Sequence, residues 1–335
     1  MNNKSTLQLL AKGDFKRGVL YAGLLLKGKE REQLFELARK RRTEYFSSEE
    51  VEVRSVIEIS NICQRKCNFC NINFYSKHKK IYTIEHEEVM KIVKHVYHKN
   101  RKVLLFQSGE NGSQSYIDFV CKCISNMKQK FRDLIIILCL GNLTYNQYRQ
   151  LREDGADRYI LKFETSNAKL YKQIKPDDSL KKRLECIEML NELDFDVGSG
   201  NIIGLPNQTI ADIVDDLLFI QHLKLTMVST SVFIPGEDSK YCDKPAGDLN
   251  IVLNYMALMR IIYPQMLIPS TSSLEKAKRG GQYLGLMAGA NAVTIHDGTP
   301  IKLKKLFPIY SVNRFTPNEK HIKDIVTKAH LIFLG

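Results

Sequence analysis

Three cysteines lie in one short stretch of the chain, ISNICQRKCNFCNINF (59–74). Cys63, Cys67 and Cys70 follow a C-x₃-C-x₂-C spacing, which brings three thiolates into one loop. A structural zinc site takes four Cys or His ligands. A [4Fe–4S] cluster held by three cysteines instead leaves one iron without a protein ligand and open to an exchangeable molecule. The loop therefore predicts a metal centre whose last ligand comes from outside the chain.

A single zinc ion is the alternative occupant of this loop. His78 follows the last cysteine and would complete a set of four ligands. Zinc sites usually pair two short chelating arms, however, and the sequence offers no second arm. With zinc, the chain would be a basic binding protein stabilised by metal rather than an enzyme.

The other cysteines and the N-terminal region indicate the cellular compartment of the protein. Eight cysteines scattered over 335 residues are not a disulfide framework, and they indicate a reducing compartment. The first apolar stretch, GVLYAGLLLKG (18–28), is too short to span a bilayer, and no signal-peptide cleavage pattern follows it. We therefore expect a soluble, cytoplasmic protein without a membrane segment.

The chain is strongly basic, with a formal net charge of +13. Such a charge is a candidate signature of nucleic-acid binding. The basic residues are spread, however, over runs that are typical of solvated helix faces or loops. These runs are ARKRR (38–42), SKHKK (76–80), KNRK (99–102) and KLKK (302–305). A polyanionic partner stays open as the alternative, because charge alone does not decide.

Short apolar, β-branched runs alternate with helical patterns along most of the chain. Strands that are apolar on both faces are typical of a buried parallel sheet. The predicted strands cover residues 53–60, 102–108, 133–141, 158–165, 197–204, 227–235, 265–273 and 291–297. They predict an α/β fold, a (β/α)₈ TIM-type barrel over 51–335, with an N-terminal helical extension over 1–50 and a C-terminal helix. A doubly wound open sheet is the alternative, because periodicity does not show closure.

Two of the predicted helices carry local signals. Thr209 and Asp212 form a capping-box pattern at the start of segment 209–223, with Asp in place of Glu. Segment 249–263 is apolar enough to need cover on more than one side. We therefore expect a capped helix after the fifth strand and a deeply buried helix after the sixth.

Polar residues gather where the predicted strands end, which is where the active site of a (β/α)₈ barrel lies. The cysteine loop follows the first strand, and QSGEN (107–111) ends the second. In RYILKFET, alternation places Ile160, Lys162 and Glu164 on one face, where a charge is costly unless it is paired or used. Arg183 lies in the first turn of a following helix. A structural Glu164–Arg183 ion pair and ligand binding are the two interpretations.

With Phe69 before its last cysteine, the loop resembles the cluster loop of the radical S-adenosylmethionine (SAM) superfamily, C-x₃-C-x-Φ-C after the first barrel strand. The resemblance implies a [4Fe–4S] cluster on Cys63, Cys67 and Cys70, whose free iron binds the amino and carboxylate groups of SAM. In that superfamily, an electron from the cluster cleaves SAM and releases a 5′-deoxyadenosyl radical that abstracts hydrogen from the substrate. The protein aims the radical and excludes water.

The resemblance also implies SAM contacts beyond the loop. QSGE resembles the motif for the methionine amino group, and GSGNIIGLP (198–206) resembles the adenine-contacting motif. Glu164 would bind the ribose hydroxyls or the amino group, and Arg183 the SAM carboxylate. The implied cofactor-binding residues are Phe69, Gln107, Ser108, Gly109, Glu110, Glu164, Thr165, Arg183 and Gly204.

From about residue 50 to 300 the chain is similar to the subgroup that includes the hydrogenase maturase HydE, methylornithine synthase and biotin synthase. GADRY, GLPNQT and DDLLF are most similar to the maturase. In that enzyme small carboxylates lie deep in the barrel, which implies substrate contacts from Lys162, Thr271 and Ser272. This chain has Lys162 where the maturase has Arg, and the two differ in bidentate carboxylate binding. Phe307 and Tyr310 are the candidates for the maturase's tyrosines.

The resemblance implies a HydE-like radical SAM enzyme that acts on a small amino-acid-derived molecule, with cysteine bound to iron as one candidate. A methylornithine-synthase-like rearrangement of an amino acid is the main alternative, and a nucleic-acid-modifying radical SAM enzyme is the alternative from a different class. A flavodoxin- or ferredoxin-type protein is the implied electron donor, and we expect a monomer. Cys139 and His296, late in the third and eighth strands, are predicted to have packing roles, with a place in the cavity as the alternative.

Overall fold

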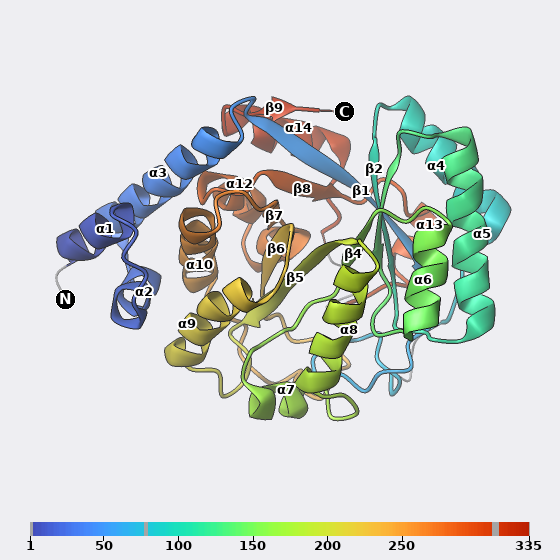
Figure 1. The fold of residues 1–335 in the computed structure, drawn as a ribbon, viewed down its shortest axis with the longest axis horizontal. Helices are drawn as coiled ribbons and strands as arrows, with labels where there is room; N and C mark the ends of the chain where they lie inside the picture. Colours follow the sequence, from blue (N-terminus) through green and yellow to red (C-terminus); the bar gives the residue numbers. More distant parts are fainter. Residues whose placement is uncertain (1–2, 77–79, 310–314, 335) are drawn as a thin grey trace.

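Eight parallel strands form the centre of the protein (Figure 1). The structure is a computed structural model that describes residues 3–76, 80–309 and 315–334. The strands run in the order β6-β5-β4-β3-β2-β1-β8-β7. They are β1 (Glu50–Ser60), β2 (Val103–Ser108), β3 (Ile135–Cys139), β4 (Arg158–Ile160), β5 (Asp196–Ile203), β6 (Met227–Val232), β7 (Pro269–Ser270) and β8 (Ala292–Ile295).

The two outer strands of this order, β6 and β7, meet and close the sheet into a ring. The amide of Val228 donates to the carbonyl of Leu267 at 3.0 Å, and the amide of Leu267 donates to Thr226 at 3.0 Å. Met227 and Leu267 form a parallel bridge at the same point. The predicted barrel is therefore confirmed, and the open-sheet alternative is wrong.

Two strands, β4 and β7, are much shorter than the sequence pattern predicts, and the predicted strand 265–273 is regular only over Pro269–Ser270. The predicted strand 158–165 pairs regularly only over Arg158–Ile160, although Leu161 and Glu164 still donate backbone hydrogen bonds to β5. Regular pairing ends at Ile160, and Glu164, in a left-handed conformation with φ +63°, makes one further parallel bridge with Asn201. At the other end of the chain, β9 (Ile332–Phe333) adds a short parallel pairing to the start of β1 that the sequence did not indicate.

Helices surround the ring on its outer side (Figure 1). The capping box of Thr209 and Asp212 forms as predicted at the start of α9. The helices that follow the strands are α4 (His86–His98), α5 (Gln114–Lys130), α6 (Tyr145–Glu153), α7 (Ala168–Ile174), α8 (Leu180–Glu192), α9 (Ile210–Phe219) with the 3₁₀ turn Ile220–His222, α10 (Leu249–Ile262), α11 (Ser272–Ala277), α12 (Gly281–Met287), α13 (Ile301–Lys304) and α14 (Glu319–Lys328).

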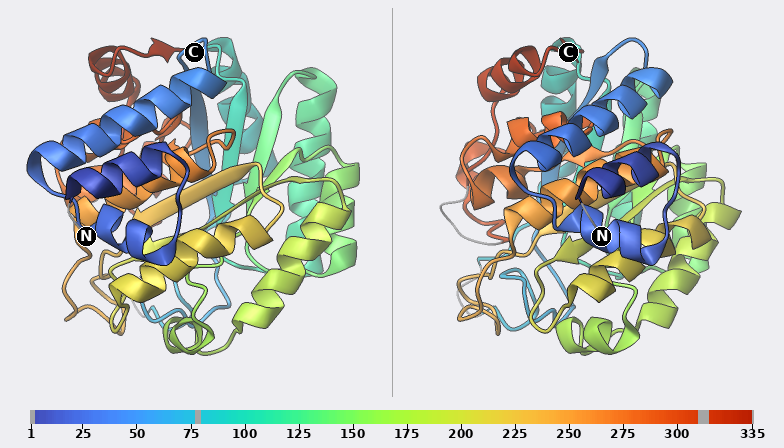
Figure 2. Two further views of the ribbon diagram at one scale, coloured as in Figure 1. Left: turned by 60° about the vertical axis from the view of Figure 1, so that its left-hand side comes forward. Right: turned by 90° about the vertical axis from the view of Figure 1, so that its left-hand side faces the viewer.

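The N-terminal helices α1 (Asn3–Ala11), α2 (Arg17–Leu24) and α3 (Gly28–Tyr45) cover one flank of the barrel (Figure 2). The apolar helix α10 packs against β6 on one side and against α2 and α3 on the other, as its composition predicts. Arg42 of α3 donates to the carbonyls of Leu286 and Ala290 at 2.9 and 3.0 Å. The extension and the barrel therefore share one apolar core, and the domain boundary drawn at residue 50 stays a prediction.

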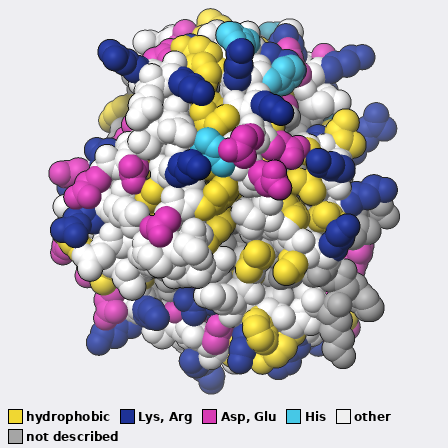
Figure 3. All heavy atoms as spheres, turned by 90° about the vertical axis from the view of Figure 1, so that its right-hand side faces the viewer, with side chains coloured by type: hydrophobic (Ala, Val, Ile, Leu, Met, Phe, Trp, Pro, Cys, Tyr) yellow, Lys and Arg dark blue, Asp and Glu magenta, His cyan; other side chains and the backbone are white. Residues whose placement is uncertain are grey.

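On the face shown in Figure 3, Lys and Arg side chains are interspersed with Asp and Glu rather than gathered into one basic surface. Exposed charges of opposite sign that alternate in this way are typical of a solvated surface. Among the described residues, no helix is both long and apolar enough to cross a lipid bilayer.

Candidate active site

The three cysteines of the loop after β1 line one cavity at the mouth of the barrel. All three carry free thiols. We call this cavity, of about 280 Å³, the cofactor chamber. Its lining includes Cys63, Cys67, Phe69, Cys70, Gln107, Ser108, Gly109, Glu110, Cys139, Ile160, Lys162, Glu164, Lys175, Arg183, Ser231, Phe233, Phe307 and Ile309. The structure thus brings together the cysteines and most of the predicted SAM contacts.

The cysteine loop is held by hydrogen bonds and by close backbone packing. Asn73 donates from Nδ2 to the carbonyls of Cys67 and Cys70 at 3.1 and 2.7 Å. A Cβ on Gly109 would lie 2.7 Å from the Cβ of Cys63 and 2.3 Å from the carbonyl oxygen of Ile62. Only a glycine allows this approach, which brings the end of β2 against the loop.

Buried ion pairs surround the cysteines. Glu110 pairs with Arg65, with Arg183 at 3.3 Å and with Lys175 at 3.9 Å. Burial alone would raise the pKa of Glu110, but the three cations together lower it below its usual value. Asp178 accepts from Arg183 at 3.3 Å and completes the network.

Arg183 is therefore already compensated by protein carboxylates. Its side chain is 3% exposed, and the hydroxyl of Tyr171 accepts from its Nε at 3.0 Å. Of the two interpretations made from sequence, the Glu164–Arg183 ion pair does not form among the described residues, because Glu110 and Asp178 take that place. The predicted contact between Arg183 and the SAM carboxylate stays a prediction.

Glu164 instead pairs with Lys162 inside the cavity. Lys162 Nζ lies 3.4 Å from Glu164 Oε2 and 3.3 Å from the hydroxyl of Ser231. Glu164 Oε2 is buried and makes no hydrogen bond to any residue that the structure describes. It therefore remains an acceptor for an incoming hydroxyl group, which fits its predicted role at a ribose.

Thr165 and Gly204, two predicted cofactor contacts, do not line either cavity described here. The Thr165 hydroxyl donates to Asp216 Oδ1 at 3.2 Å. The Gly204 amide donates to Gln208 at 2.7 Å, and a Cβ at residue 204 would lie 2.2 Å from the Cα of Gly247. Both residues shape the backbone behind the cofactor chamber, and direct contacts of either with SAM stay predictions.

Asp216 of α9 joins the segments that carry these two residues. It accepts hydrogen bonds from the backbone of Ser166 at 2.6 Å and from Asn201 Nδ2 at 3.0 Å. Burial raises the pKa of Asp216 to about 6, although its hydrogen bonds act in the opposite direction. Asp216 thus positions the backbone at Ser166 and the side chain of Asn201.

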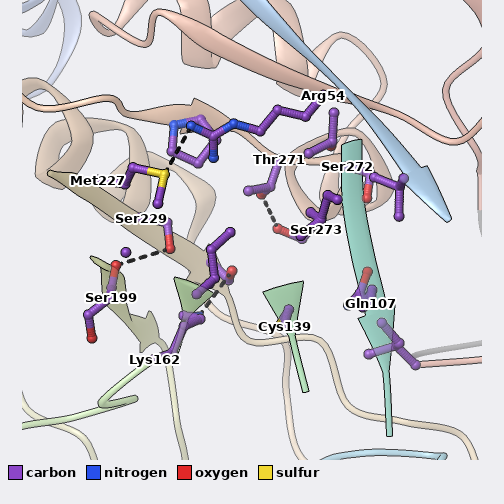
Figure 4. A pocket seen from close by; sticks show the side chains of 18 of the residues that line it. Arg54, Gln107, Cys139, Lys162, Ser199, Met227, Ser229, Thr271, Ser272 and Ser273 are labelled. Atoms are coloured by element: carbon purple, nitrogen blue, oxygen red, sulfur yellow. Dashed lines mark hydrogen bonds between the residues drawn. The ribbon is translucent and has the colours of Figure 1, made fainter. Parts of the chain in front are cut away.

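A second cavity, which we call the inner chamber, lies deeper in the barrel and encloses about 170 Å³ (Figure 4). The two chambers share Gln107, Cys139, Ile160, Lys162, Ser231 and Ile309. The predicted substrate residues Lys162, Thr271 and Ser272 all line it. The remaining lining is Arg54, Val56, Leu105, Gly198, Ser199, Met227, Val228, Ser229, Pro269, Ser273, Thr294 and His296.

Cys139 and His296 both face the cavities rather than only the packed core. Cys139 lies on the boundary shared by the two chambers, and His296 lies in the inner chamber. The alternative that gave them a place in the cavity is therefore the one that the structure shows. Phe307 lines the cofactor chamber, whereas Tyr310 lies outside the described residues.

Arg54 is the main residue of the inner chamber that sequence reasoning missed. It is fully buried, pairs with Glu52 at 2.6 Å and donates toward the sulfur of Met227 at 3.5 Å (Figure 4). The signal was present, because an arginine within the buried strand VRSVIEIS is costly unless it is paired or used. The serines of β5 and β6 gave no comparable signal.

The cysteine loop fits a [4Fe–4S] cluster better than one zinc ion. No three His, Cys, Asp or Glu side chains in the described part of the chain converge as they would around a single ion. A cluster does not need such convergence, because each cysteine binds a different iron. His78, the candidate fourth zinc ligand, lies outside the described residues.

The charges around the loop also suit a cluster bound by three thiolates. Burial raises the pKa of the Cys67 thiol to about 12, so a metal must displace its proton on binding. Lys175 and Arg183 line the same chamber and oppose the negative charge of such a cluster.

Residues 57–220 match the sequence profile of the Radical SAM superfamily. The [FeFe] hydrogenase maturase subunit HydE of Thermotoga maritima is 33% identical to the chain over 312 residues, which is 92% of this chain and 88% of the relative. The chain belongs to the radical SAM superfamily. Radical SAM enzymes use a [4Fe–4S] cluster and SAM, which agrees with the donor set of the cysteine loop.

Other radical SAM relatives cover most of the chain as well. A biotin synthase of Clostridium acetobutylicum is 26% identical over 75% of this chain and 78% of its own length. The crystal structure of methylornithine synthase (PylB) superposes with a TM-score of 0.81 at 23% identity, over 97% of this chain and 95% of that one. At this identity the superposition shows the fold alone, and it agrees with the closed barrel.

Proposed function

We propose that the chain is a HydE-like radical SAM enzyme that acts on a small, amino-acid-derived substrate, with cysteine bound to iron as a candidate. The observation that carries the proposal is the junction of the two chambers. Lys162 and Cys139 line both, so a molecule in the inner chamber faces whatever occupies the cofactor chamber. The identity to HydE along nearly the whole chain supports the same assignment.

In the cofactor chamber, the residues of the chain hold and orient the cofactors. When bound, the cluster and SAM supply a one-electron cleavage that generates a 5′-deoxyadenosyl radical. Cys63, Cys67 and Cys70 would hold the cluster, and Glu164 would accept from the ribose hydroxyls. The ion pairs of Glu110 fix the wall next to the cysteines before any ligand arrives. Such preorganisation keeps reacting groups in place without reorganisation during the reaction.

In the inner chamber, Lys162 would bind a substrate carboxylate together with Thr271 and Ser272. Lys162 already donates to a hydroxyl and pairs with Glu164, so its ammonium group is oriented into the cavity. Lysine binds a carboxylate as a point charge, whereas an arginine in its place would bind with two parallel hydrogen bonds. This difference predicts a substrate pose that is not identical to that of HydE.

A methylornithine-synthase-like rearrangement of an amino acid is the second candidate. The 26% identity to a 3-methylornithine synthase of Methanosarcina acetivorans over 79% of this chain supports it, and both reactions would use the same pair of chambers. The small volume of the inner chamber, about 170 Å³, is hard to reconcile with a nucleotide as the substrate. For the partners, we propose a flavodoxin- or ferredoxin-type electron donor, a monomeric enzyme and a cytoplasmic location.

Anaerobic reconstitution with iron and sulfide tests the proposal. The wild-type protein should bind about four irons and release 5′-deoxyadenosine from SAM in the presence of a reductant. Cys67→Ala should lose both, whereas Cys242→Ala, at an exposed cysteine away from the chambers, should retain both. One bound zinc ion, or no metal, in the wild-type protein would contradict the proposed function.

Comparison of substrates then distinguishes the two candidates. A cysteine–iron complex and a basic amino acid such as lysine would be offered separately to the reconstituted enzyme. Consumption of the iron complex supports the HydE-like reaction, and rearrangement of the amino acid supports the synthase-like reaction.

A further inference from the structure

Lys175 is a buried cation in the wall of the cofactor chamber, and the proposed function gives it no role. Its side chain is 5% exposed, and it lines the chamber together with Cys67 and Glu110. Its ion-pair partners among the described residues are Asp178 Oδ2 at 3.7 Å and Glu110 Oε2 at 3.9 Å. Both distances allow an ion pair, but both exceed the length of a hydrogen bond.

The two arginines of the same network are bonded more closely than Lys175. Arg183 donates to the hydroxyl of Tyr171 at 3.0 Å and to Glu110 at 3.3 Å, and Arg65 also donates to Glu110. The ammonium group of Lys175 makes no hydrogen bond to any group in the described part of the chain. Because a buried ammonium group has three donors and is costly without acceptors, Lys175 is suited to an acceptor that enters the chamber.

The neighbouring charges keep Lys175 protonated. Burial alone would lower the pKa of its ammonium group, and Arg183 acts in the same direction. Glu110 opposes both, and the pKa lies above the ordinary value of a lysine. The side chain is therefore a fixed positive charge in the chamber wall.

Backbone hydrogen bonds bring Lys175 alongside Cys67. The amide of Asn68, directly after Cys67, donates at 2.8 Å to the carbonyl of Ile174, directly before Lys175. The amide that precedes Cys67 donates at 3.2 Å to a carboxylate oxygen of Asp177. These two bonds join the segments on either side of the cysteine and of the lysine, so the two side chains meet the chamber next to each other.

The backbone of Lys175 is itself held in place. Its amide donates to the carbonyl of Tyr171 at 2.9 Å, and its carbonyl accepts from the amide of Asp178 at 3.1 Å. Pro176 follows and cannot continue the helix, which ends α7 at this point. The lysine is therefore placed beside the cysteine loop by the fold and not by a ligand.

We propose that Lys175 donates hydrogen bonds to the sulfur atoms of the cluster next to Cys67 and raises the reduction potential of the cluster. Net charge and hydrogen bonds to the sulfurs set the potential of an iron–sulfur cluster. Reduction adds one negative charge, which a fixed positive charge close by stabilises. The proposal rests on the proposed function, because it takes the three cysteines as the ligands of a cluster.

A redox titration followed by electron paramagnetic resonance tests this role in the reconstituted protein without SAM. Lys175→Met should shift the reduction equilibrium about tenfold toward the oxidised cluster, which lowers the midpoint potential by about 59 mV for one electron. Lys175→Arg keeps the charge and should retain most of the wild-type potential. Lys169→Met, at an exposed lysine of α7, is the matched control and should leave the potential unchanged.

Two results of this titration would overturn the proposal. One is an unchanged potential in Lys175→Met, and the other is an equal fall in Lys175→Met and Lys175→Arg. Calorimetry with SAM identifies the alternative acceptor, the SAM carboxylate. Weaker binding of SAM to Lys175→Met with an unchanged potential would show that the ammonium group binds SAM and not the cluster.

A second variant covers the case in which Lys175→Met does not assemble a cluster, because it leaves buried carboxylates with one cation fewer. Lys175→Gln keeps a hydrogen-bond donor in that place without the charge, and its potential should fall in the same direction. Failure of both variants to bind about four irons, with Lys169→Met unaffected, would overturn the proposal, because the lysine would then act in assembly and not on the potential.

The same preparations separate failure of this inference from failure of the proposed function. If the wild-type protein binds about four irons and cleaves SAM but the Lys175 variants keep its potential, only the inference fails. If the wild-type protein shows neither the irons nor SAM cleavage, the proposed function fails first.

Discussion

The cofactor chamber and the inner chamber adjoin each other but are built in different ways. The cofactor chamber draws on loops in which neighbouring residues act together, such as the cysteine loop and the segment after β2. The inner chamber draws single inward-facing side chains from most of the strands, such as Arg54, Ser199 and His296. The first kind of site carries a compact sequence signature, and the second is assembled only when the ring closes.

The chambers also differ in how their charges are balanced. In the cofactor chamber, Glu110 has three cationic partners, and the network is nearly complete without a ligand. In the inner chamber, Lys162 pairs with Glu164 and Arg54 pairs with Glu52. We therefore expect substitutions in the first to affect stability and cluster content, and substitutions in the second to affect ligand binding.

Arg183→Met should have the largest effect on stability. It leaves Glu110 and Asp178 with one cation fewer in a buried network, and breaking such pairs costs about 3–5 kcal/mol. Chemical denaturation measures the change in the free energy of unfolding. Lys181→Met, on the same helix in a mostly exposed pair with Glu185, is the matched control and should have little effect. Equal effects of the two variants would show that the network does not stabilise the chamber.

Asp216→Asn should change how stability depends on pH. Burial raises the pKa of Asp216 to about 6 in the folded protein, so this group binds its proton more tightly in the folded state than in the unfolded state. Its contribution to the free energy of unfolding is therefore complete below about pH 4 and is lost as the pH rises through about 6. The total loss is about 3 kcal/mol, because each unit of pKa difference between the folded and unfolded states corresponds to about 1.4 kcal/mol.

Denaturation of wild type and Asp216→Asn between pH 4 and 7 measures that loss, which the variant should lack. Asp215→Asn, at the neighbouring and more exposed carboxylate, is the control and should keep the wild-type pH dependence. Parallel curves for wild type and Asp216→Asn would contradict the assignment.

Gly109→Ala should lower the iron content of the reconstituted protein. The added Cβ would lie 2.3 Å from the carbonyl oxygen of Ile62, so the cysteine loop must shift, with a cost of about 1–3 kcal/mol. Gly112→Ala, where the added Cβ meets no atom within 4 Å, is the matched control. Iron and sulfide analysis of the two variants decides between them. Binding of butyrate, a small carboxylate that probes the inner chamber, should change less than iron content in either variant.

Thr271→Val should have the smallest effect, and only in the inner chamber. It removes a hydroxyl that lies 2.8 Å from that of Ser273 and that we expect to contact the substrate carboxylate. Loss of one neutral hydrogen bond should weaken butyrate binding by about threefold. The iron content should match that of the wild-type protein, and a loss of iron would show that the two chambers are not separable.

The sequence predicted those parts of the molecule whose structure depends on residues that are close together in the chain. The alternation of strands and helices, the capping box at Thr209 and the buried helix α10 follow from periodicity and from short motifs, whereas closure of the barrel does not. The position of Glu164 in the cavity was also predictable from alternation along RYILKFET, although its left-handed backbone was not. The cysteine loop was predictable because its three cysteines lie within eight residues.

The partners of the charged residues were not predictable in the same way. Arg183 could be placed near the mouth, but its pairing with Glu110 joins segments more than 70 residues apart. The pairing of Glu58 with His296 depends on β1 and β8 becoming neighbours, which requires the ring to close. Such contacts depend on tertiary distances that no local pattern encodes.

The closure of the ring has a mechanical consequence. Strands β1 and β2 pair over most of their length, whereas β6 meets the segment before β7 through the backbone hydrogen bonds of Val228 and Leu267. Pairings β3–β4 and β7–β8 are also short, with two residue pairs each. Short pairings of this kind open before long ones. Deuterium should therefore replace the amide protons at Val228 and Leu267 well before those in the middle of β2, because the barrel opens locally between β6 and the segment before β7.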